Sequence, residues 1–252
     1  MSLRSSYTRL APFYDALVGP LLARARRRSL ERLPRENGLQ IFLNGIGTGL
    51  DLPLLPPASH YTALDLTAAM LARARLRQQA LQVQWVQGDS QRLPFAASSF
   101  HHAVLHLILA IVPDTVAALR ETARVIRTGG RIYVLDKFLR RGDAALLRKL
   151  LNPLASRIAT RTDVVFEDAL DQVRSLRIVE DRPAFAGGWF RLITLEKTGD
   201  QEGPEESGSS SSRRGHVHQT MPTSNDTAIA TSISSQTSPL IAAQPLRKFV
   251  DA

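Results

Sequence analysis

Short apolar runs alternate with helical patterns through the middle of the chain. The runs that predict strands cover residues 41–43, 61–64, 83–86, 103–107 and 131–135. Between them, apolar residues recur at helical spacing over 50–55, 68–81 and 115–126, with the glycine pair 129–130 closing the last of these helices. Strands that alternate with helices in this way form a parallel sheet, because each crossover helix returns the chain to the same edge.

The pattern changes after residue 135. Two more helices are expected over 144–158 and 166–173, followed by strands over 176–180 and 190–195 that a loop with Gly187 and Gly188 joins. These two strands are too close for a helical crossover, so they should pair antiparallel at the edge of the sheet. The sequence therefore predicts an α/β fold: a Rossmann-like, seven-stranded, mostly parallel sheet with an antiparallel C-terminal strand pair and helices on both faces.

Composition divides the chain into three regions. Residues 1–40 form an Arg-rich lead-in, expected to be helical, broken near Gly19–Pro20 and packed on the domain that follows. Residues 41–197 hold the alternating pattern. Residues 198–252 are rich in Ser and Thr without periodicity, and we expect this tail to be disordered because it cannot bury enough apolar area to offset chain entropy.

Charge and composition limit the classes of function. The formal net charge is +9, and the tail holds four basic and six acidic residues, so residues 1–197 carry the whole excess. A basic domain suits anionic partners such as phospholipid headgroups, or simply has a solvated arginine surface. The absence of cysteine excludes disulfides and thiolate chemistry. The N-terminus has no signal-peptide core and no apolar run is long enough to cross a bilayer, which predicts a cytoplasmic protein.

The strongest chemical signal is the segment IFLNGIGTGLDLPLL. Its predicted strand runs into Gly45, Gly47 and Gly49, and glycines at the carboxyl end of a parallel strand let the backbone approach a nucleotide closely. A dinucleotide site would space its glycines as G-x-G-x-x-G, whereas Leu50 stands here where the last of them belongs. The spacing therefore disfavours a nicotinamide cofactor, and a plain strand-to-helix turn is the remaining alternative.

Two aspartates follow the next strands along the same edge. Asp65 comes about twenty residues after the glycines, where a carboxylate accepts hydrogen bonds from ribose hydroxyls. It could instead cap the next helix, although Thr67 is able to do so. Asp89, in the segment Gly88–Ser90, could accept a hydrogen bond from an exocyclic amine or be an idle loop acid. Together these residues predict a site for an adenosyl group.

The segments as a set resemble the class I S-adenosylmethionine-dependent methyltransferases. The resemblance covers residues 7–197 and is nearest to the branch that contains quinone-biosynthesis methyltransferases and bacterial phosphatidylethanolamine N-methyltransferases. It rests on YTRLAPFYDALVGPLLARARRR, GIGTGLDLPLLP, ALDLTAAMLARAR, GDSQRLPFAASSF, ILAIVPD, RVIRTGGRIYVLDKF and FAGGWFRLITLEK. It implies S-adenosyl-L-methionine as cofactor and methyl transfer to a small-molecule or lipid acceptor, for which the amine of phosphatidylethanolamine is one candidate.

The resemblance also assigns roles by position. The three glycines fall to the methionine and ribose end of the cofactor, Asp65 with Leu66 to the ribose, and Asp89 with Ser90 to the adenine. His106 falls beside the reactive sulfonium, where it is a candidate base, and Tyr14 is a second catalytic candidate that, like Tyr7, lies over cofactor or substrate in relatives. A histidine hydrogen-bonded at a strand end is the alternative for His106. No metal site is expected.

Two positions depart from the family pattern. Leu43 and His101 stand where relatives usually carry acids, the first of which contacts the cofactor's amino group. Loss of one charge-assisted hydrogen bond costs about 1.5 to 3 kcal/mol, which would weaken cofactor binding without abolishing it. A non-catalytic binding protein with this fold, or a quinone C-methyltransferase, therefore remains an alternative to a lipid methyltransferase.

The lead-in predicts a membrane contact. Apolar residues come first, and four arginines follow them: Arg24, Arg26, Arg27 and Arg28. A basic amphipathic helix lies well on an anionic bilayer, which would make the protein peripheral at the inner membrane face. The alternative is a cap over the cofactor cleft with a solvated arginine face. No specific nucleic-acid partner is expected, because no aromatic residues or reader motifs interleave with the arginines.

Overall fold

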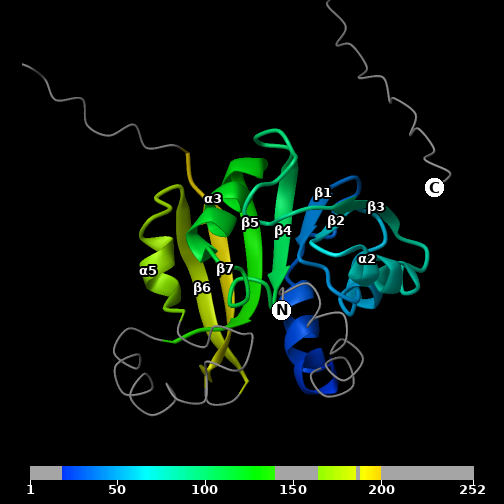
Figure 1. The fold of residues 1–252 in the computed structure, drawn as a ribbon, viewed down its shortest axis with the longest axis horizontal. Coiled ribbons are helices and arrows are strands. Elements are labelled where there is room, and N and C mark those ends of the chain that lie inside the picture. The colour runs from blue at the N-terminus through cyan, green and yellow to red at the C-terminus, as the bar shows by residue number, and fades with distance from the viewer. Residues whose placement is uncertain (1–18, 140–163, 186–187, 200–252) are drawn as a thin grey trace, which may run out of the picture. The chain divides into compact units, whose positions relative to one another are not determined.

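The structure, a computed structural model, describes residues 19–139, 164–185 and 188–199 (Figure 1). Tyr7, Tyr14, the expected helix over 144–158 and the tail from residue 200 onward lie outside the described residues. No helix among those described is both long and apolar enough to cross a membrane.

One seven-stranded sheet organises the described chain, in the order β3-β2-β1-β4-β5-β7-β6. The strands are β1 (Gln40–Asn44), β2 (His60–Asp65), β3 (Gln82–Gln87), β4 (Phe100–His106), β5 (Ile126–Lys137), β6 (Leu176–Phe185) and β7 (Phe190–Lys197). The first five run parallel, and β7 lies antiparallel between β5 and β6. The predicted fold, including its antiparallel C-terminal pair, is confirmed. The carboxyl ends of β1 to β5 therefore share one edge.

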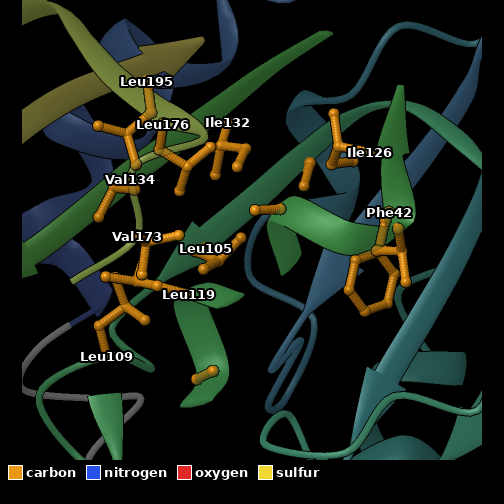
Figure 2. Packing of buried hydrophobic residues seen from close by; sticks show 14 of the residues in the cluster. Phe42, Leu105, Leu109, Leu119, Ile126, Ile132, Val134, Val173, Leu176 and Leu195 are labelled. Atoms are coloured by element: carbon orange, nitrogen blue, oxygen red, sulfur yellow. The ribbon is translucent and has the colours of Figure 1, made fainter. Parts of the chain in front are cut away.

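Residue alternation along the strands separates two cores, as expected for a sheet covered on both faces. On β1, Phe42 packs in a cluster with residues of α3 (Thr115–Val125) and α5 (Phe166–Leu170). Its neighbours Ile41 and Leu43 point to the other face, where α2 (Ala68–Arg75) covers them. Figure 2 shows side chains from β4, β5, β7 and α3 meeting in the first cluster, among them Leu105, Val134, Leu195 and Leu119.

The lead-in contributes a helix over residues 19–30, the blue helix in Figure 1. It is described from Gly19–Pro20, where the sequence predicts a break. Leu22 and Ala25 pack in a third cluster with Leu135 of β5 and Leu192 of β7. The helix is thus held against the strands that border the carboxyl edge.

Three elements differ from the expected bounds, each for a local reason. The helix expected over 50–55 is only a turn of 3-10 helix, η1 (Leu52–Leu54), because prolines 53, 56 and 57 limit the backbone hydrogen bonds that it can form. Helix α2 ends at Arg75 instead of 81, where Leu76 is 88% exposed and Gln79 has a φ of 50°. The third is the glycine pair 129–130, which lies inside β5 because the strand begins directly after α3.

Candidate functional site

Three loops meet at the carboxyl edge of the sheet. The backbone N–H groups of Gly45 and Ile46 donate to the carbonyl of Leu64 at 2.9 and 3.0 Å, which ties the end of β1 to the end of β2. The N–H of Gly88 donates to the carbonyl of Asp65 at 3.0 Å, which ties β3 to β2 in the same way. The segments that sequence reasoning assigned to one site therefore lie side by side.

Residues 45–49 (the glycine loop) contain three glycines, which are required for two different reasons. All three have positive φ, at 73°, 56° and 82°. A Cβ on Gly45 would come within 2.7 Å of the Ile108 side chain, and one on Gly49 within 2.8 Å of the Ala74 Cα atom. A Cβ on Gly47 would meet nothing within 4 Å. Gly45 and Gly49 are therefore required by packing, whereas Gly47 borders open space that a ligand can enter.

Asp65 braces the glycine loop. Its Oδ2 accepts a hydrogen bond from the N–H of Gly47 at 2.9 Å, and its Oδ1 accepts one from the N–H of Thr67 at 3.0 Å. Burial raises the pKa of Asp65, and these hydrogen bonds partly offset that effect. Helix α2 is capped by Thr67, whose hydroxyl accepts from the N–H of Met70 at 3.3 Å. The Asp65 carboxylate is thus not the cap, and it stands beside the open space at Gly47.

Around Asp65, the residues assigned to ribose and adenine take different positions. Leu66 is 40% exposed at the edge. Asp89 is exposed, and its Oδ1 accepts from the N–H of Gln91 at 2.9 Å. Ser90 points inward instead: it is 5% exposed and donates to Asn44 Oδ1 at 2.5 Å. The Ser90 hydroxyl therefore lies in the interior, where it is a partner of the buried Asn44, and the assignment of Ser90 to the adenine stays a prediction.

His106 lies in a buried group of four side chains, Arg26, Ser29, Asp51 and His106 (the polar cluster). Its Nδ1 is 2.9 Å from Asp51 Oδ1, and its Nε2 is 2.9 Å from Ser29 Oγ. Arg26 Nη1 donates to the same Asp51 oxygen at 2.7 Å. The cluster joins the N-terminal helix, the residue that follows the glycine loop and the end of β4. Its members are all at most 8% exposed.

Asp51 is ionised in this cluster. Burial opposes ionisation, but the charge of Arg26 and the contacts with His106 outweigh it and hold the pKa of Asp51 well below its usual range. Both ring nitrogens of His106 already have partners. The assignment of His106 as a base stays a prediction, and it would require the ring to release Ser29 or Asp51.

Sequence reasoning missed three members of the polar cluster, Arg26, Ser29 and Asp51. Helical periodicity could have indicated that Arg26 is buried. The buried positions of residues 19–33 form one stripe at spacings of three and four: 22, 25, 26, 29, 30 and 33. Arg26 belongs to that stripe. The expected basic face of the lead-in therefore consists of Arg24, Arg27 and Arg28, which are exposed, and not of Arg26.

The two departures from the family pattern have different consequences. His101 lies at the start of β4, the end away from the carboxyl edge, and its Nδ1 accepts from the N–H of Gln40 at 2.9 Å. The histidine that replaces the family acid here therefore contacts the neighbouring strand β1 and lies away from the glycine loop. Leu43 is 1% exposed in the core beneath the glycine loop. No carboxylate is supplied from that position.

Comparisons with known proteins agree with this geometry. Residues 44–134 match the sequence profile of a family described as a methyltransferase domain. The chain is 30% identical over 197 residues to a phosphatidylethanolamine N-methyltransferase of Cereibacter sphaeroides, covering 76% of this chain and 96% of that enzyme. It is 41% identical over 81 residues to a ubiquinone/menaquinone biosynthesis C-methyltransferase of Roseobacter denitrificans, covering 31% of this chain and 32% of that enzyme.

A solved structure shows the same fold. A chain from the complex between the Trm112 methyltransferase activator of Haloferax volcanii and a methyltransferase superposes with a TM-score of 0.63 at 17% identity, covering 77% of this chain and 98% of that one. The chain belongs to the S-adenosylmethionine-dependent methyltransferases. It is a methyltransferase, and S-adenosylmethionine is its cofactor.

The described residues fit that cofactor. An adenosyl group requires a backbone that it can approach closely and a carboxylate for its ribose hydroxyls. The open space at Gly47 and the adjoining Asp65 carboxylate supply these features.

Proposed function

We propose that this enzyme methylates the amine of a phospholipid of the phosphatidylethanolamine class. The observation that carries the proposal is the extent of the likeness to the Cereibacter enzyme, which spans 96% of that protein and so includes more than the cofactor-binding half. The likeness to the quinone C-methyltransferase covers only 32% of that protein. Cofactor binding is common to both classes, so the longer match is the one that informs about the acceptor.

The site edge suggests how the cofactor is held. Gly45, Gly47 and Gly49 would lie along its methionine and ribose end, Asp65 with Leu66 at the ribose, and Asp89 at the adenine. When bound, the cofactor supplies a methyl group already activated on a sulfonium, so the chain contributes mainly alignment. The acceptor amine would give up a proton, its nitrogen would then bond to the methyl carbon, and the carbon–sulfur bond would break with its electrons left on sulfur. Water would take the proton, or His106 would if its ring released Ser29 or Asp51.

The surface next to the site suits a lipid acceptor. On the N-terminal helix, Leu21 is 52% exposed, and Phe185 and Trp189 at the β6–β7 end are each 40% exposed. The third apolar cluster connects these two elements, since Leu22 packs there with Phe190. The exposed Arg24, Arg27 and Arg28 follow on the same helix. Apolar side chains beside cations suit an anionic bilayer interface.

The test uses S-adenosylmethionine with a labelled methyl group. The full chain is incubated with vesicles of phosphatidylethanolamine mixed with an anionic phospholipid, and in parallel with a demethylated quinone precursor in the same vesicles without the amino-lipid. We expect label in the amino-lipid headgroup and none in the quinone. Label in the quinone alone would favour the C-methyltransferase, and label in neither would contradict both.

A further inference from the structure

Arg26 uses only part of its hydrogen-bonding capacity. Its Nη1 donates to Asp51 Oδ1 at 2.7 Å, yet its Nε is buried and has no acceptor within the described part of the chain. The side chain is 9% exposed. A buried donor without a partner is rare in folded proteins, and a bound ligand is one of the explanations for it. Arginine presents Nε and Nη2 as one planar fork that matches a carboxylate.

The unpartnered edge lies where the cofactor's amino-acid end is expected. Asp51, the partner of Arg26, comes two residues after Gly49 at the end of the glycine loop. His106, at the carboxyl end of β4, contacts the same Asp51 oxygen. The guanidinium of Arg26 is therefore fixed between the glycine loop and the end of β4.

Asp51 also has spare capacity. Among the described residues, both hydrogen bonds that its side chain accepts go to Oδ1, and the side chain does not cap η1 although Asp51 occupies the N-cap position. No described residue donates to Oδ2, which can therefore accept from a cation. An arginine fork beside a carboxylate is complementary to a zwitterion, which carries one carboxylate and one ammonium.

We propose that Arg26 and Asp51 together bind the amino-acid end of S-adenosylmethionine, with Arg26 on its carboxylate and Asp51 on its ammonium. This proposal rests on the cofactor placement proposed above. It assigns to Asp51 the carboxylate that Leu43 does not supply. His106 and Ser29 are positioning residues: the chain of hydrogen bonds from Ser29 through His106 ends on Asp51 Oδ1, the same oxygen that Arg26 contacts, and so fixes the orientation of the carboxylate.

The experiment measures binding of three ligands to the full chain by isothermal titration calorimetry. S-adenosylhomocysteine carries the whole amino-acid end, decarboxylated S-adenosylmethionine keeps only the ammonium, and 5′-methylthioadenosine has neither group. The principal variant is Arg26→Lys, which keeps the positive charge beside Asp51 but lacks the fork. Arg27→Lys is the matched control, because Arg27 is exposed on the same helix.

We expect Arg26→Lys to weaken S-adenosylhomocysteine about tenfold to a hundredfold, as for one or two lost charge-assisted hydrogen bonds. Binding of the other two ligands should change less than twofold, and Arg27→Lys should bind all three as the unaltered chain does. Asp51→Asn should weaken the two ligands that carry an ammonium and spare 5′-methylthioadenosine.

Equal weakening of all three ligands by Arg26→Lys would overturn the proposal, because it would indicate a structural role. Unchanged binding of S-adenosylhomocysteine would overturn it as well. If the unaltered chain binds none of the three ligands, the cofactor placement itself is wrong and this proposal falls with it. That result differs from failure of the proposal alone, in which the unaltered chain binds and only the variant pattern is lost.

Discussion

Two regions of the molecule each bury an arginine, and they use it differently. At the carboxyl edge, Arg26 contacts one carboxylate, and no acceptor for its Nε lies among residues 19–139, 164–185 and 188–199. On β7, Arg191 is 2% exposed, and its Nε and Nη2 donate to the two oxygens of Asp181 at 3.1 and 2.5 Å. Its Nη2 also donates to Glu167 Oε1 at 2.7 Å. In Arg191 the Nε and Nη2 donors thus have carboxylate acceptors within the protein, whereas the Nε of Arg26 has none among the described residues.

The comparison teaches which buried charges belong to the fold. Arg191 joins β6, β7 and α5. Burial acts to lower its pKa, but the hydrogen bonds that it donates to Asp181 and Glu167 outweigh burial and raise the pKa. Within the described part of the chain its Nη1 has no partner, and neither has the buried Glu167 Oε2 of the same group. The Nε of Arg26 has no acceptor among the described residues, and the proposal above assigns its fork to a ligand.

The largest effect on stability is expected from Arg191→Met. This change leaves two carboxylates without their cation and should lower the free energy of unfolding by about 3–4 kcal/mol. We expect the low end of that range, because Asp181 and Glu167 are 29% and 26% exposed. Urea denaturation measures it. Adding Asp181→Asn and Glu167→Gln to Arg191→Met should restore part of the lost stability. If Arg191→Met alone costs less than about 1 kcal/mol, Arg191 is not required by the fold and the contrast with Arg26 fails.

Asp136 offers a second test, since it is a buried carboxylate with neither arginine near it. Its oxygens accept from the N–H groups of Ala110 and Lys137 at 3.1 and 2.8 Å. Burial raises the pKa of Asp136 to about 6, above its value in the unfolded chain. The folded state therefore binds more protons between pH 4 and pH 6, and the free energy of unfolding should fall by about 2–3 kcal/mol as pH rises through that window.

Denaturation of the unaltered chain and of Asp136→Asn at several pH values isolates this contribution. The amide does not titrate, so the variant should lack this part of the slope. The same slope in both proteins would show that another group is responsible. Asp51 contributes with the opposite sign and at lower pH, because its pKa lies below the usual range.

The glycine loop contains the same contrast between fold and ligand. Gly49→Ala combines a φ of 82° with a Cβ placed 2.8 Å from the Ala74 backbone, and should cost about 2 kcal/mol of stability. Gly47→Ala has open space and should cost about 1 kcal/mol, yet it should weaken S-adenosylhomocysteine at least tenfold because the methyl group enters the ligand's space. Thermal denaturation and calorimetry measure the pair. If the two variants lose ligand affinity in proportion to their loss of stability, the assignment of Gly47 to the ligand is wrong.

The smallest effect on stability is expected outside the cluster. Arg27→Gln with Arg28→Gln should change the free energy of unfolding by less than about 0.5 kcal/mol, because both side chains are exposed. Binding to anionic vesicles should weaken by about 1 kcal/mol per arginine. Vesicle sedimentation measures this, with Arg174→Gln as the matched control, because Arg174 is also exposed but lies between α5 and β6. If Arg174→Gln weakens vesicle binding as much per arginine, the N-terminal helix has no specific role in binding the membrane.

Much of the fold was predictable because local pattern carries it. The end of β2 that holds Asp65 and the loop after β3 that holds Asp89 had to share an edge once the sheet was parallel. Element ends were less predictable. Leu76 and the prolines of 50–57 ended helices that periodicity alone extended, because periodicity reports the buried face and not the last hydrogen bond.

The sequence by itself determined the order of strands and helices, the family, and the glycine loop with its neighbouring Asp65. Tertiary structure alone decided that Arg26, Asp51 and His106 meet, and that Ser90 turns inward to Asn44. The contacts of Asp51 with Arg26 and His106 join residues 25 and 55 positions apart. No periodic pattern in the sequence relates residues so far apart. How the helices and strands pack decides which residue becomes the partner of a buried charge.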